Sequence, residues 1–495
     1  MTETSHDPRT GAVNGEVAES TVEEVRSAVR AAAAVAPVAA ATPPDVRRDW
    51  LAAVADALEA DLEALVALAD AETALGATRL SGEVQRAAGQ LRFYGAVAAD
   101  GGYLRAAVDT TGGQHLARVG VPLGPVAVFG ASNFPLGFGV VGNDTASALA
   151  AGCPVVVKAH PAHPLLSLRL ARLAQAALAA AGAPDGLLGL VVGHRAGVDL
   201  VRAPEIAAVG FTGSQAGGLA LWRIANEREV VIPVYAEMGT VNPVVVTEAA
   251  APRMAEIAAG FVGSATLGAG QFCTKPGLLL APAGSRAAEE VAKALRTADP
   301  APIMLTAAIA EAVSTGIDEL VAAGGRPVDL VEPSGLGWSA PAAVIEADPG
   351  DLRPGSRLLA ECFGPVVVVA EYDDAAERDA VLARLQGALA ASLVTAGPDD
   401  PDGAALARRL SGQVGRVVVD GWPTGVAFTW AQQHGGPWPA TSAPTATSVG
   451  AAALDRFVRP VAFQDVPDAW LPPPVQQANP WRVPRRVDGV LEVPR

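Results

Sequence analysis

The chain has 495 residues, half of them hydrophobic and 18% charged, which supplies enough apolar material for several packed domains and excludes a disordered chain. Its formal net charge of −16 disfavours binding to nucleic acids or to anionic membranes. The three cysteines, Cys153, Cys273 and Cys362, are too few for a disulfide framework and favour a reducing compartment. No signal peptide is visible, and no apolar run approaches the about 18–20 residues of a membrane span. We therefore expect a cytoplasmic protein.

The first hundred residues carry helical patterns behind a polar segment. Residues 1–19 are polar and contain glycine, so we expect a loose leader. Thr21-Val-Glu-Glu24 resembles a capping box, from which a helix should run towards Pro37. A Pro-Pro pair then opens a second helix, and a third is expected over 79–98. The buried face of the second helix recurs every three or four residues and comprises Trp50, Leu51, Val54, Leu58, Leu62, Leu65 and Leu68.

After residue 102 the pattern changes to strands. Residues 103–122 read as two strands around a Gly-containing turn. From residue 125 onward, continuous apolar runs alternate with helical segments, which indicates buried parallel strands and an α/β fold. The first series comprises PVAVFG, a helix over 142–151, PVVVK, a helix over 165–182, LGLVVG and AAVGFTG. The series restarts after residue 240 with NPVVV, a helix over 253–266, LLLAP and a helix over 286–297, which predicts a second α/β domain.

Cys273 is the candidate nucleophile. It lies in Gly-Ala-Gly-Gln-Phe-Cys273-Thr-Lys-Pro-Gly, where small residues let the backbone approach a ligand closely. A thiolate is a strong soft nucleophile. A lone cysteine is more often a buried structural residue, and we keep that interpretation for Cys153 and Cys362.

Two polar residues stand at expected strand ends. Glu237 follows the apolar stretch VVIPVYA, so burial would raise its pKa and suit it to act as a general base. Asn133 follows PVAVFG, where its amide is able to donate to a developing oxyanion. Each residue also has a plainer interpretation, namely a salt-bridged surface Glu and an Asn that shapes the turn before Pro135.

Six sequence blocks occur in the order and spacing of the aldehyde dehydrogenase superfamily, which the chain resembles over nearly its whole length. They are Asn133-Phe-Pro, Lys158 after PVVV, Phe-Thr-Gly-Ser214, Glu237-Met-Gly, Gly-Gln-Phe-Cys273 and Glu361-Cys-Phe-Gly-Pro. A narrower resemblance, carried by KAHPAHP, FTGSQAGG and HGGPWPATSAPTATSVG, is to a bacterial branch of NADP+-dependent aldehyde dehydrogenases and 2-oxoglutarate-semialdehyde (2,5-dioxopentanoate) dehydrogenases.

The resemblance implies an aldehyde dehydrogenase fold with two Rossmann-like parallel-sheet domains and a small oligomerisation β-arm. In the family the hairpin pairs with the C-terminal segment, so we expect a homodimer or homotetramer. The implied divisions are a cofactor-binding domain at 1–102 and 123–238, an oligomerisation hairpin at 103–122, a catalytic domain at 239–455 and a C-terminal segment at 456–495 that contributes to oligomerisation.

The resemblance also implies a mechanism. Cys273 would attack the aldehyde carbon, the amide of Asn133 and the backbone N–H of Cys273 would stabilise the oxyanion, and a thioester would form on the sulfur. Glu237 would activate the water that hydrolyses this thioester to a carboxylic acid. Members that transfer the acyl group to CoA lack this glutamate, so its presence favours the free acid.

A dinucleotide site is expected without the common Gly-x-Gly-x-x-Gly motif, which is absent after the first strand. The resemblance implies that the pyrophosphate binds where the strand ending at Gly213 meets the helix starting at Ser214. The other implied contacts are Lys158 at the adenosine ribose, Glu361 at the nicotinamide ribose, and Phe363 and Gly239 nearby.

NADP+ is the favoured cofactor and NAD+ the alternative. Relatives that prefer NAD+ usually carry a Glu three residues after the Lys, whereas this chain has Pro161, so that Lys158 is free to attract a 2′-phosphate. His160, His163 and Arg195 are candidates to assist Lys158 in binding this phosphate. We expect no metal, because prolines break any helix that would join the two histidines and no Cys or Asp partner is evident.

The substrate pocket is less defined by sequence. Matching segments place Leu136, Phe138, Val140 and Val141 near the aldehyde, with residues around Trp438 and Ser442 closing the pocket. A substrate carboxylate would need a cation, Arg86 or Arg92, or the amide of Gln90. Arg86 and Gln90 share a helix face by spacing, although ordinary helix-surface contacts explain that spacing equally well.

Three alternatives remain. The first is a CoA-acylating aldehyde dehydrogenase, which Glu237 disfavours. The second is a cysteine hydrolase or acyltransferase, which needs a histidine near Cys273, and none of the six histidines has a comparable strand-end position. The third is a non-catalytic scaffold, which the complete set of Asn133, Glu237 and Cys273 disfavours.

Overall fold

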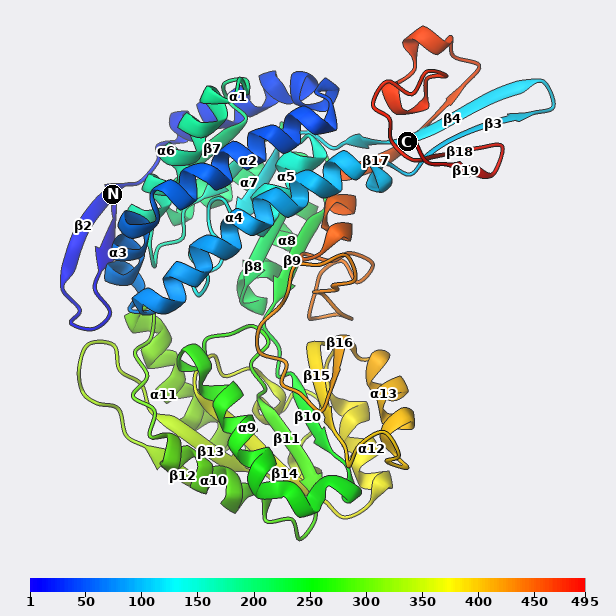
Figure 1. The fold of residues 1–495 in the computed structure, drawn as a ribbon. Coiled ribbons are helices and arrows are strands. Elements are labelled where there is room, and N and C mark those ends of the chain that lie inside the picture. The colour runs from blue at the N-terminus through cyan, green and yellow to red at the C-terminus, as the bar shows by residue number, and fades with distance from the viewer. Residues whose placement is uncertain (495) are drawn as a thin grey trace.

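The computed structural model of the chain describes residues 1–494, which form two α/β lobes, an N-terminal hairpin and a projecting β-arm (Figure 1). The first lobe contains helices α1 Val22–Ala41, α2 Pro44–Ala60, α3 Leu62–Thr73, α4 Ala77–Asp100, α5 Asn143–Ala151, α6 Pro164–Ala180, α7 His194–Arg202 and α8 Gln215–Asn226. Its strands are β5 Val126–Phe129, β6 Val155–Lys158, β7 Leu188–Val191, β8 Ala208–Gly213 and β9 Val234–Met238.

The second lobe contains helices α9 Met254–Thr266, α10 Ala287–Ala298, α11 Ala307–Ala322, α12 Ala375–Arg384 and α13 Gly403–Ser411. Its strands are β10 Pro243–Val246, β11 Leu278–Pro282, β12 Arg326–Val331, β13 Ala342–Glu346, β14 Val366–Tyr372, β15 Ala388–Val394 and β16 Val414–Val419. The arm contains β3 Ala106–Thr111, β4 Gln114–Pro122, β17 Val458–Gln464, β18 Arg485–Val487 and β19 Val490–Glu492, and the N-terminal hairpin is β1 Thr2–His6 and β2 Val13–Ala18.

Each lobe is built on a parallel sheet, which confirms the expected fold class. The first sheet has the order β7-β6-β5-β8-β9, and the second has the order β12-β13-β14-β11-β10-β15-β16, in which β12 alone is antiparallel to its neighbour. Strands β5, β10 and β15 are buried along their whole length, as strands covered by helices on both faces must be. Parallel pairing brings the carboxyl ends of β5, β6, β8 and β9 to one edge.

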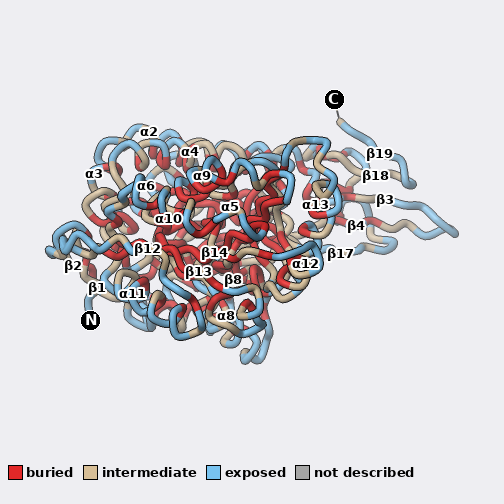
Figure 2. The backbone as a smooth tube through the Cα atoms, turned by 90° about the horizontal axis from the view of Figure 1, so that it is seen from below, coloured by how far each residue is buried: buried red, intermediate tan, exposed pale blue. Residues whose placement is uncertain are grey.

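The arm sheet is formed within one chain, in the order β17-β4-β3-β18-β19. The hairpin of β3 and β4 thus lies between two pieces of the C-terminal segment. Figure 2 shows that buried backbone is concentrated in the two lobes, whereas the arm is largely exposed. Among the described helices, none combines the length and the apolar composition that a bilayer crossing requires.

Several local expectations need correction. Helix α1 starts with the expected Thr21–Glu24 capping box but continues through Pro37 to Ala41, because Pro37 faces solvent while Val35 and Ala39 stay buried. The second helix is divided at Asp61, whose backbone is not helical, so Leu62 to Leu68 belong to α3.

Residues 1–19 are not a loose leader. They form the β1–β2 hairpin, in which Val17 packs on Ala159 and Val192 of the first lobe. At the hairpin turn, the carbonyl of Pro8 accepts a hydrogen bond of 2.8 Å from the backbone N–H of Trp338 in the second lobe. The hairpin therefore contacts both lobes.

Candidate active site

A strained loop between α9 and β11 carries Cys273. Gly268, Ala269 and Gly270 have φ angles of 58°, 59° and 69°, all in the left-handed region. A side chain at position 270 would collide with the backbone of Gly364, so the loop needs glycine there. The close approach brings Cys273 against the loop that contains Glu361.

Two buried side chains that the sequence did not single out hold this loop in place. The ammonium group of Lys275 donates to the carbonyls of Cys362, Gly364 and Val366 at 2.9, 3.0 and 2.7 Å. The amide of Asn242 donates to the Cys273 carbonyl at 2.8 Å. The only sequence signal was Lys275 itself, within an apolar stretch in which a proline and a glycine follow it. That pattern does not identify the groups that the lysine binds.

Cys273 and Asn133 line the same cavity between the lobes, which has a volume of about 540 Å³. The amide nitrogen of Asn133 donates one hydrogen bond of 2.7 Å to the carbonyl of Gln271 and keeps a second N–H. The backbone carbonyl of Asn133 accepts a hydrogen bond of 2.6 Å from the guanidinium of Arg79, which fixes the loop after β5. The sulfur and an amide donor therefore face one reaction space.

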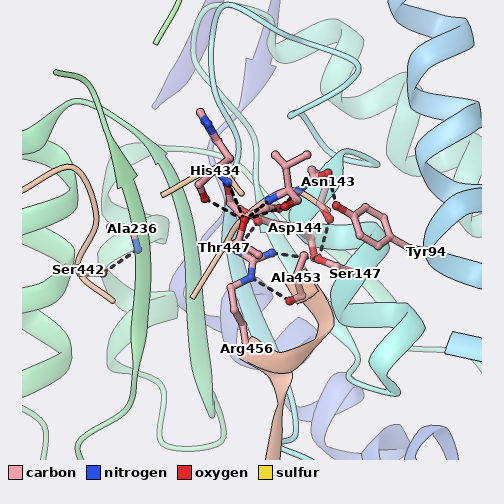
Figure 3. Close-up of polar contacts among 12 residues, drawn as sticks. Tyr94, Asn143, Asp144, Ser147, Ala236, His434, Ser442, Thr447, Ala453 and Arg456 are labelled. Carbon is pink, nitrogen blue, oxygen red and sulfur yellow. Dashed lines mark hydrogen bonds and ion pairs between the residues drawn. The ribbon is translucent and has the colours of Figure 1, made fainter. Parts of the chain in front are cut away.

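His434 is the nearest titratable partner of the sulfur. Its Nε2 lies 3.7 Å from Sγ of Cys273. Burial, together with the positive charges of Arg416 and Arg86, lowers the pKa of His434 to about 3, so the ring is neutral at physiological pH. The backbone N–H of His434 donates to the hydroxyl of Thr447 at 2.8 Å (Figure 3). The sequence showed no histidine in a comparable strand-end position, but the segment after β16 folds back and brings His434 to Cys273.

The thiol of Cys273 is protonated in its resting environment. Burial, together with the negative charges of Glu361 and Glu237, raises its pKa to about 12. A thiol of this kind needs a proton acceptor at the moment of attack. The neutral ring of His434 is placed to be that acceptor.

Glu237 lies in β9, and burial raises its pKa well above the ordinary value for a carboxyl group. Its Oε2 has no hydrogen-bond partner among the described residues. Arg456 counteracts this rise, but that guanidinium is already paired with Asp144 at 2.8 Å in a buried network (Figure 3). Glu237 does not line the 540 Å³ cavity, although its charge reaches Cys273.

Gly213, Ser214, Gly239, Glu361 and Phe363 all line the cavity that contains Cys273. A side chain at position 239 would collide with the Glu361 carboxylate, so glycine keeps this part of the cleft open. The Ser214 hydroxyl caps α8 by accepting from Gly217 at 3.2 Å. A capped helix start beside a carboxylate fits the pyrophosphate and ribose of a dinucleotide. Burial raises the pKa of Glu361 to about 7.

Lys158 ends β6 beside this cleft, and its side chain packs near Gly197 of α7. Burial lowers the pKa of its ammonium, while the carboxylate of Glu3 raises it. The sequence has Pro161 in place of an acidic residue close to Lys158. The N-terminal hairpin nevertheless brings the carboxylate of Glu3, which is 155 residues away in sequence, to act on Lys158. Arg195 is exposed and lies 3.8 Å from Asp199.

His160 and His163 stack with ring centroids 5.4 Å apart. The Nε2 of His163 lies 3.2 Å from the carbonyl of Ala131, and Nδ1 of His160 accepts from the backbone N–H of Ala162 at 3.1 Å. Within residues 1–494 neither histidine joins a cluster of three or more potential metal ligands. Both therefore help to shape the turn beneath the cavity.

Arg86 and Gln90 share a face of α4, and both side chains approach Gly137. The guanidinium of Arg86 lies 5.9 Å from the ring centre of Phe138 and 5.6 Å from that of Phe428. The fully buried Gln90 donates to Oδ1 of Asn143 at 3.2 Å. Arg92 points elsewhere and forms ion pairs with Glu59 and Asp56 at 2.7 and 2.6 Å, so it is not a substrate candidate.

Other expected pocket residues lie elsewhere. Leu136, Val140 and Val141 belong to the core of the first lobe. Trp438 is half exposed, and the Ser442 hydroxyl accepts from the backbone N–H of Ala236 at 2.9 Å, next to Glu237 in β9. Ser442 positions β9, and Trp438 faces solvent. The chain crosses β9 at Thr441, which bridges to Glu237, before it reaches Thr447, the residue that His434 contacts.

Aromatic residues contribute to the entrance instead. The rings of Phe93 and Phe428 lie 5.7 Å apart, and those of Phe93 and Trp430 lie 6.4 Å apart. A second cavity of about 310 Å³ opens next to them and contains Arg79, Arg86 and Phe272 in its wall. Cys273 thus lines the larger cavity, and Phe272, the residue before it, lines the second cavity.

Comparison with known proteins agrees with this geometry. The chain matches the model of the "Aldehyde dehydrogenase family" over residues 2–437. It is 44% identical over 467 residues to alpha-ketoglutaric semialdehyde dehydrogenase 2 of Azospirillum brasilense, which covers 91% of this chain and 89% of the relative. It is 38% identical over 492 residues to alpha-ketoglutaric semialdehyde dehydrogenase of Acinetobacter baylyi, with coverages of 96% and 92%.

Among solved structures, 1-pyrroline-5-carboxylate dehydrogenase from Thermus with bound NAD has a TM-score of 0.81 at 23% identity and covers 94% of this chain and 90% of that chain. A proline utilization A protein from Bradyrhizobium japonicum has a TM-score of 0.77 at 26% identity, with coverages of 90% and 45%. These likenesses establish the fold of both lobes.

Proposed function

This chain belongs to the aldehyde dehydrogenase family, and we propose that it oxidises 2-oxoglutarate semialdehyde to 2-oxoglutarate, with NADP+ as the favoured hydride acceptor and NAD+ as the alternative. Oxidation of an aldehyde with NAD(P)+ follows from the family. The individual substrate and the cofactor preference are our proposal. The observation that carries the proposal is the shared cavity, in which a thiol, an amide donor and a dinucleotide cleft meet.

The first half of the reaction uses Cys273, His434 and Asn133. The neutral ring of His434 accepts the thiol proton while the sulfur adds to the aldehyde carbon. The free N–H of Asn133 and the backbone N–H of Cys273 donate to the resulting oxyanion. A bound NAD(P)+ supplies the acceptor for the hydride that leaves this adduct. The product of this half is a thioester on Cys273.

Glu237 acts in the second half. Its raised pKa gives its carboxylate the basicity to take a proton from water, which then attacks the thioester carbonyl. The carboxylic acid leaves and Cys273 regains its thiol. Because Glu237 does not line the cavity wall, its side chain has to turn toward the sulfur for this step.

We propose that the cofactor binds to the residues that the sequence resemblance implied. Ser214 and the start of α8 bind the pyrophosphate, Glu361 accepts from the nicotinamide ribose, and Lys158 lies at the adenosine ribose. NADP+ is favoured because Pro161 supplies no carboxylate at the 2′-position. Glu3 opposes this preference through its charge.

The substrate proposal rests on the two semialdehyde dehydrogenase relatives and on Arg86. Its guanidinium has a buried Nε without a hydrogen-bond partner. A buried cation of this kind selects a substrate with a carboxylate. The aromatic rings of Phe138 and Phe428 enclose the carbon chain.

Steady-state kinetics with a panel of aldehydes and both cofactors test the proposal. The panel contains 2-oxoglutarate semialdehyde, succinate semialdehyde and pentanal, each with NADP+ and NAD+. We expect the highest kcat/KM for the first substrate with NADP+. A higher value for pentanal would refute the carboxylated substrate, and a higher value with NAD+ would refute the cofactor preference.

One further activity has a specific observation in its favour. The 3.7 Å contact between His434 and Cys273 is the arrangement of a cysteine hydrolase or acyltransferase. We propose ester hydrolysis as a side reaction of the same site, measured with a nitrophenyl ester in the absence of NAD(P)+. Transfer to CoA is disfavoured by Glu237, and an assay of the product with and without CoA tests it.

We propose a homodimer or homotetramer that forms through the β-arm. The arm ends in β17 and β19, which are the outer strands of its sheet. Exposed strand edges of this kind pair readily with another chain. Light scattering should give two or four times the 50.0 kDa mass of one chain. We further propose a cytoplasmic location.

A further inference from the structure

Arg416 is a second cation on the substrate side that the proposed mechanism does not use. It lies in β16, an edge strand of the second sheet, whereas Arg86 lies on α4 of the other lobe (Figure 1). Its guanidinium donates to the carbonyl of Pro423. Among the described residues it makes no other side-chain hydrogen bond and no ion pair, so most of its five N–H groups are free.

One loop connects Arg416 with Arg86. The segment after β16 begins at Pro423, which Arg416 binds, and reaches Phe428, on whose ring Arg86 lies. Between them, the backbone N–H of Gly425 donates to the hydroxyl of Thr274 at 3.2 Å. Thr274, next to the nucleophile Cys273, thus anchors a loop that Arg416 contacts at Pro423 and Arg86 contacts at Phe428.

Electrostatics places both arginines close to the reacting group. Burial lowers the pKa of Arg416 and of Arg86. The charge of Glu83 counteracts this most strongly at Arg86, and the charge of Cys273 counteracts it at both arginines. The two arginines are also the groups whose positive charges lower the pKa of His434. Among the described residues, neither half-buried guanidinium group forms an ion pair, although the carboxylate of Glu83 acts on Arg86 through its charge. Such groups are costly to bury unless an anion completes them.

We propose that Arg416 and Arg86 together bind the carboxylate of the substrate, one from each lobe. This inference rests on the proposed function, because it assumes a substrate that carries a carboxylate. Arg416 would supply specificity for the short oxo acid aldehydes, since a guanidinium can pair with a carboxylate and an adjacent keto oxygen. Neutral aldehydes would leave both charges without a partner.

Alkylation of Cys273 by two reagents of nearly equal size tests this without turnover or cofactor. Iodoacetate carries a carboxylate, and iodoacetamide carries a neutral amide. In the wild-type protein we expect the ratio of their rates to favour iodoacetate relative to the ratio for free cysteine. Arg416→Gln and Arg86→Gln should each lower this ratio by about 10-fold or more, as expected for a lost charge-assisted hydrogen bond. Arg416→Lys should restore part of it.

Arg92→Gln is the matched control, because Arg92 lies on the same helix as Arg86 and pairs with Glu59 and Asp56 outside the site. It should leave the ratio unchanged. An Arg416→Gln variant that slows both reagents equally would overturn the proposal, since Arg416 would then act only through the loop that it binds. An unchanged ratio in a folded variant, as judged by its circular dichroism, would overturn it as well.

Kinetics separate this inference from the proposed function. With the preferred carboxylated aldehyde, Arg416→Gln should raise KM by about 10- to 100-fold, which is a larger change than the one in KM for pentanal. If the wild-type protein fails to oxidise 2-oxoglutarate semialdehyde but keeps its preference for iodoacetate, the proposed substrate is wrong and the anion site stands. If it oxidises the semialdehyde and Arg416→Gln changes neither readout, the anion site is wrong and the proposed function stands.

Discussion

The Nε2 of His434 lies 3.7 Å from Sγ of Cys273, although 161 residues separate them in sequence. A thiol with a pKa near 12 is almost wholly protonated at neutral pH, whereas His434 has a pKa near 3 and is neutral. In the proposed mechanism the proton therefore leaves the thiol as the sulfur attacks, rather than before it, because a ring with so low a pKa is a weak base. The hydroxyl of Thr447 holds the backbone of His434, because it accepts from the N–H and donates to the carbonyl of that residue.

Replacing His434 by Gln should slow acylation of Cys273 by about 100-fold, within the range of general base catalysis. A presteady-state measurement of NADPH formation provides the rate. The same change at His115 in the exposed arm should have no effect. Normal acylation by His434→Gln would show that the thiol loses its proton to another group.

Replacing Cys273 by Ser should lower aldehyde oxidation by about 10³-fold or more, because a hydroxyl in this buried environment does not ionise and is a poor nucleophile. Spectrophotometric assay of NADPH formation measures the loss. Cys362→Ser is the control, since Cys362 belongs to the core of the second lobe. Retained activity in Cys273→Ser would contradict the assignment of the nucleophile.

Replacing Glu237 by Gln should leave the initial burst of NADPH and slow steady-state turnover by about 10²- to 10⁴-fold, since only hydrolysis of the thioester needs this base. Stopped-flow absorbance records both phases. Mass spectrometry should detect the acylated protein during turnover. Equal losses of burst and steady state would instead assign Glu237 to the first half of the reaction.

Much of this site was predictable because its chemistry lies in short contiguous blocks. Cys273, Glu237 and Asn133 each follow a strand or a glycine-rich turn that the sequence reveals locally. Parallel pairing then brings the positions of Asn133 and Glu237 to one edge of the first sheet, whereas Cys273 comes from a loop of the second lobe. Fold class and catalytic candidates therefore follow from local patterns and from the family resemblance.

The partners that tune these residues were not predictable in the same way. His434 and Arg416 follow no strand-end pattern, and they reach the site only because the chain after β16 folds back against Cys273. Glu3 lies in a polar segment whose pairing depends on Val17 packing against Ala159. Such contacts join segments more than 100 residues apart, and no local preference encodes them.

Replacing Glu361 by Gln should lower the pKa of Cys273, because the negative charge that destabilises the thiolate is removed. Glu361 itself has a pKa near 7, so its charge is present above that pH and absent below it. Alkylation by neutral iodoacetamide should thus be faster in the variant at pH 9 and equal to that of the wild type at pH 5. Glu346→Gln, at a surface position, is the control. A slower reaction at pH 9 would reverse the sign and contradict this account.

Glu3 lies on the N-terminal hairpin, and its carboxylate raises the pKa of Lys158, for which we propose a position at the adenosine ribose. A negative charge here attracts ribose hydroxyls and repels a 2′-phosphate. Glu3→Gln should therefore lower KM for NADP+ by about two- to fivefold, the range for a partly exposed charge pair, and leave KM for NAD+ unchanged or higher. The measurement is the ratio of kcat/KM for the two cofactors with one aldehyde.

Glu16→Gln is the matched control for Glu3, because it removes an exposed carboxylate from the same hairpin, where Glu16 pairs with Thr4. It should leave the ratio unchanged, since its charge is not among those that act on Lys158. Equal changes in both variants would mean that the change in cofactor preference comes from the net charge of the hairpin and not from the position of Glu3. A gain for NAD+ in Glu3→Gln would mean that the hairpin does not set the discrimination at the 2′-position, and that Lys158 and Pro161 alone determine it.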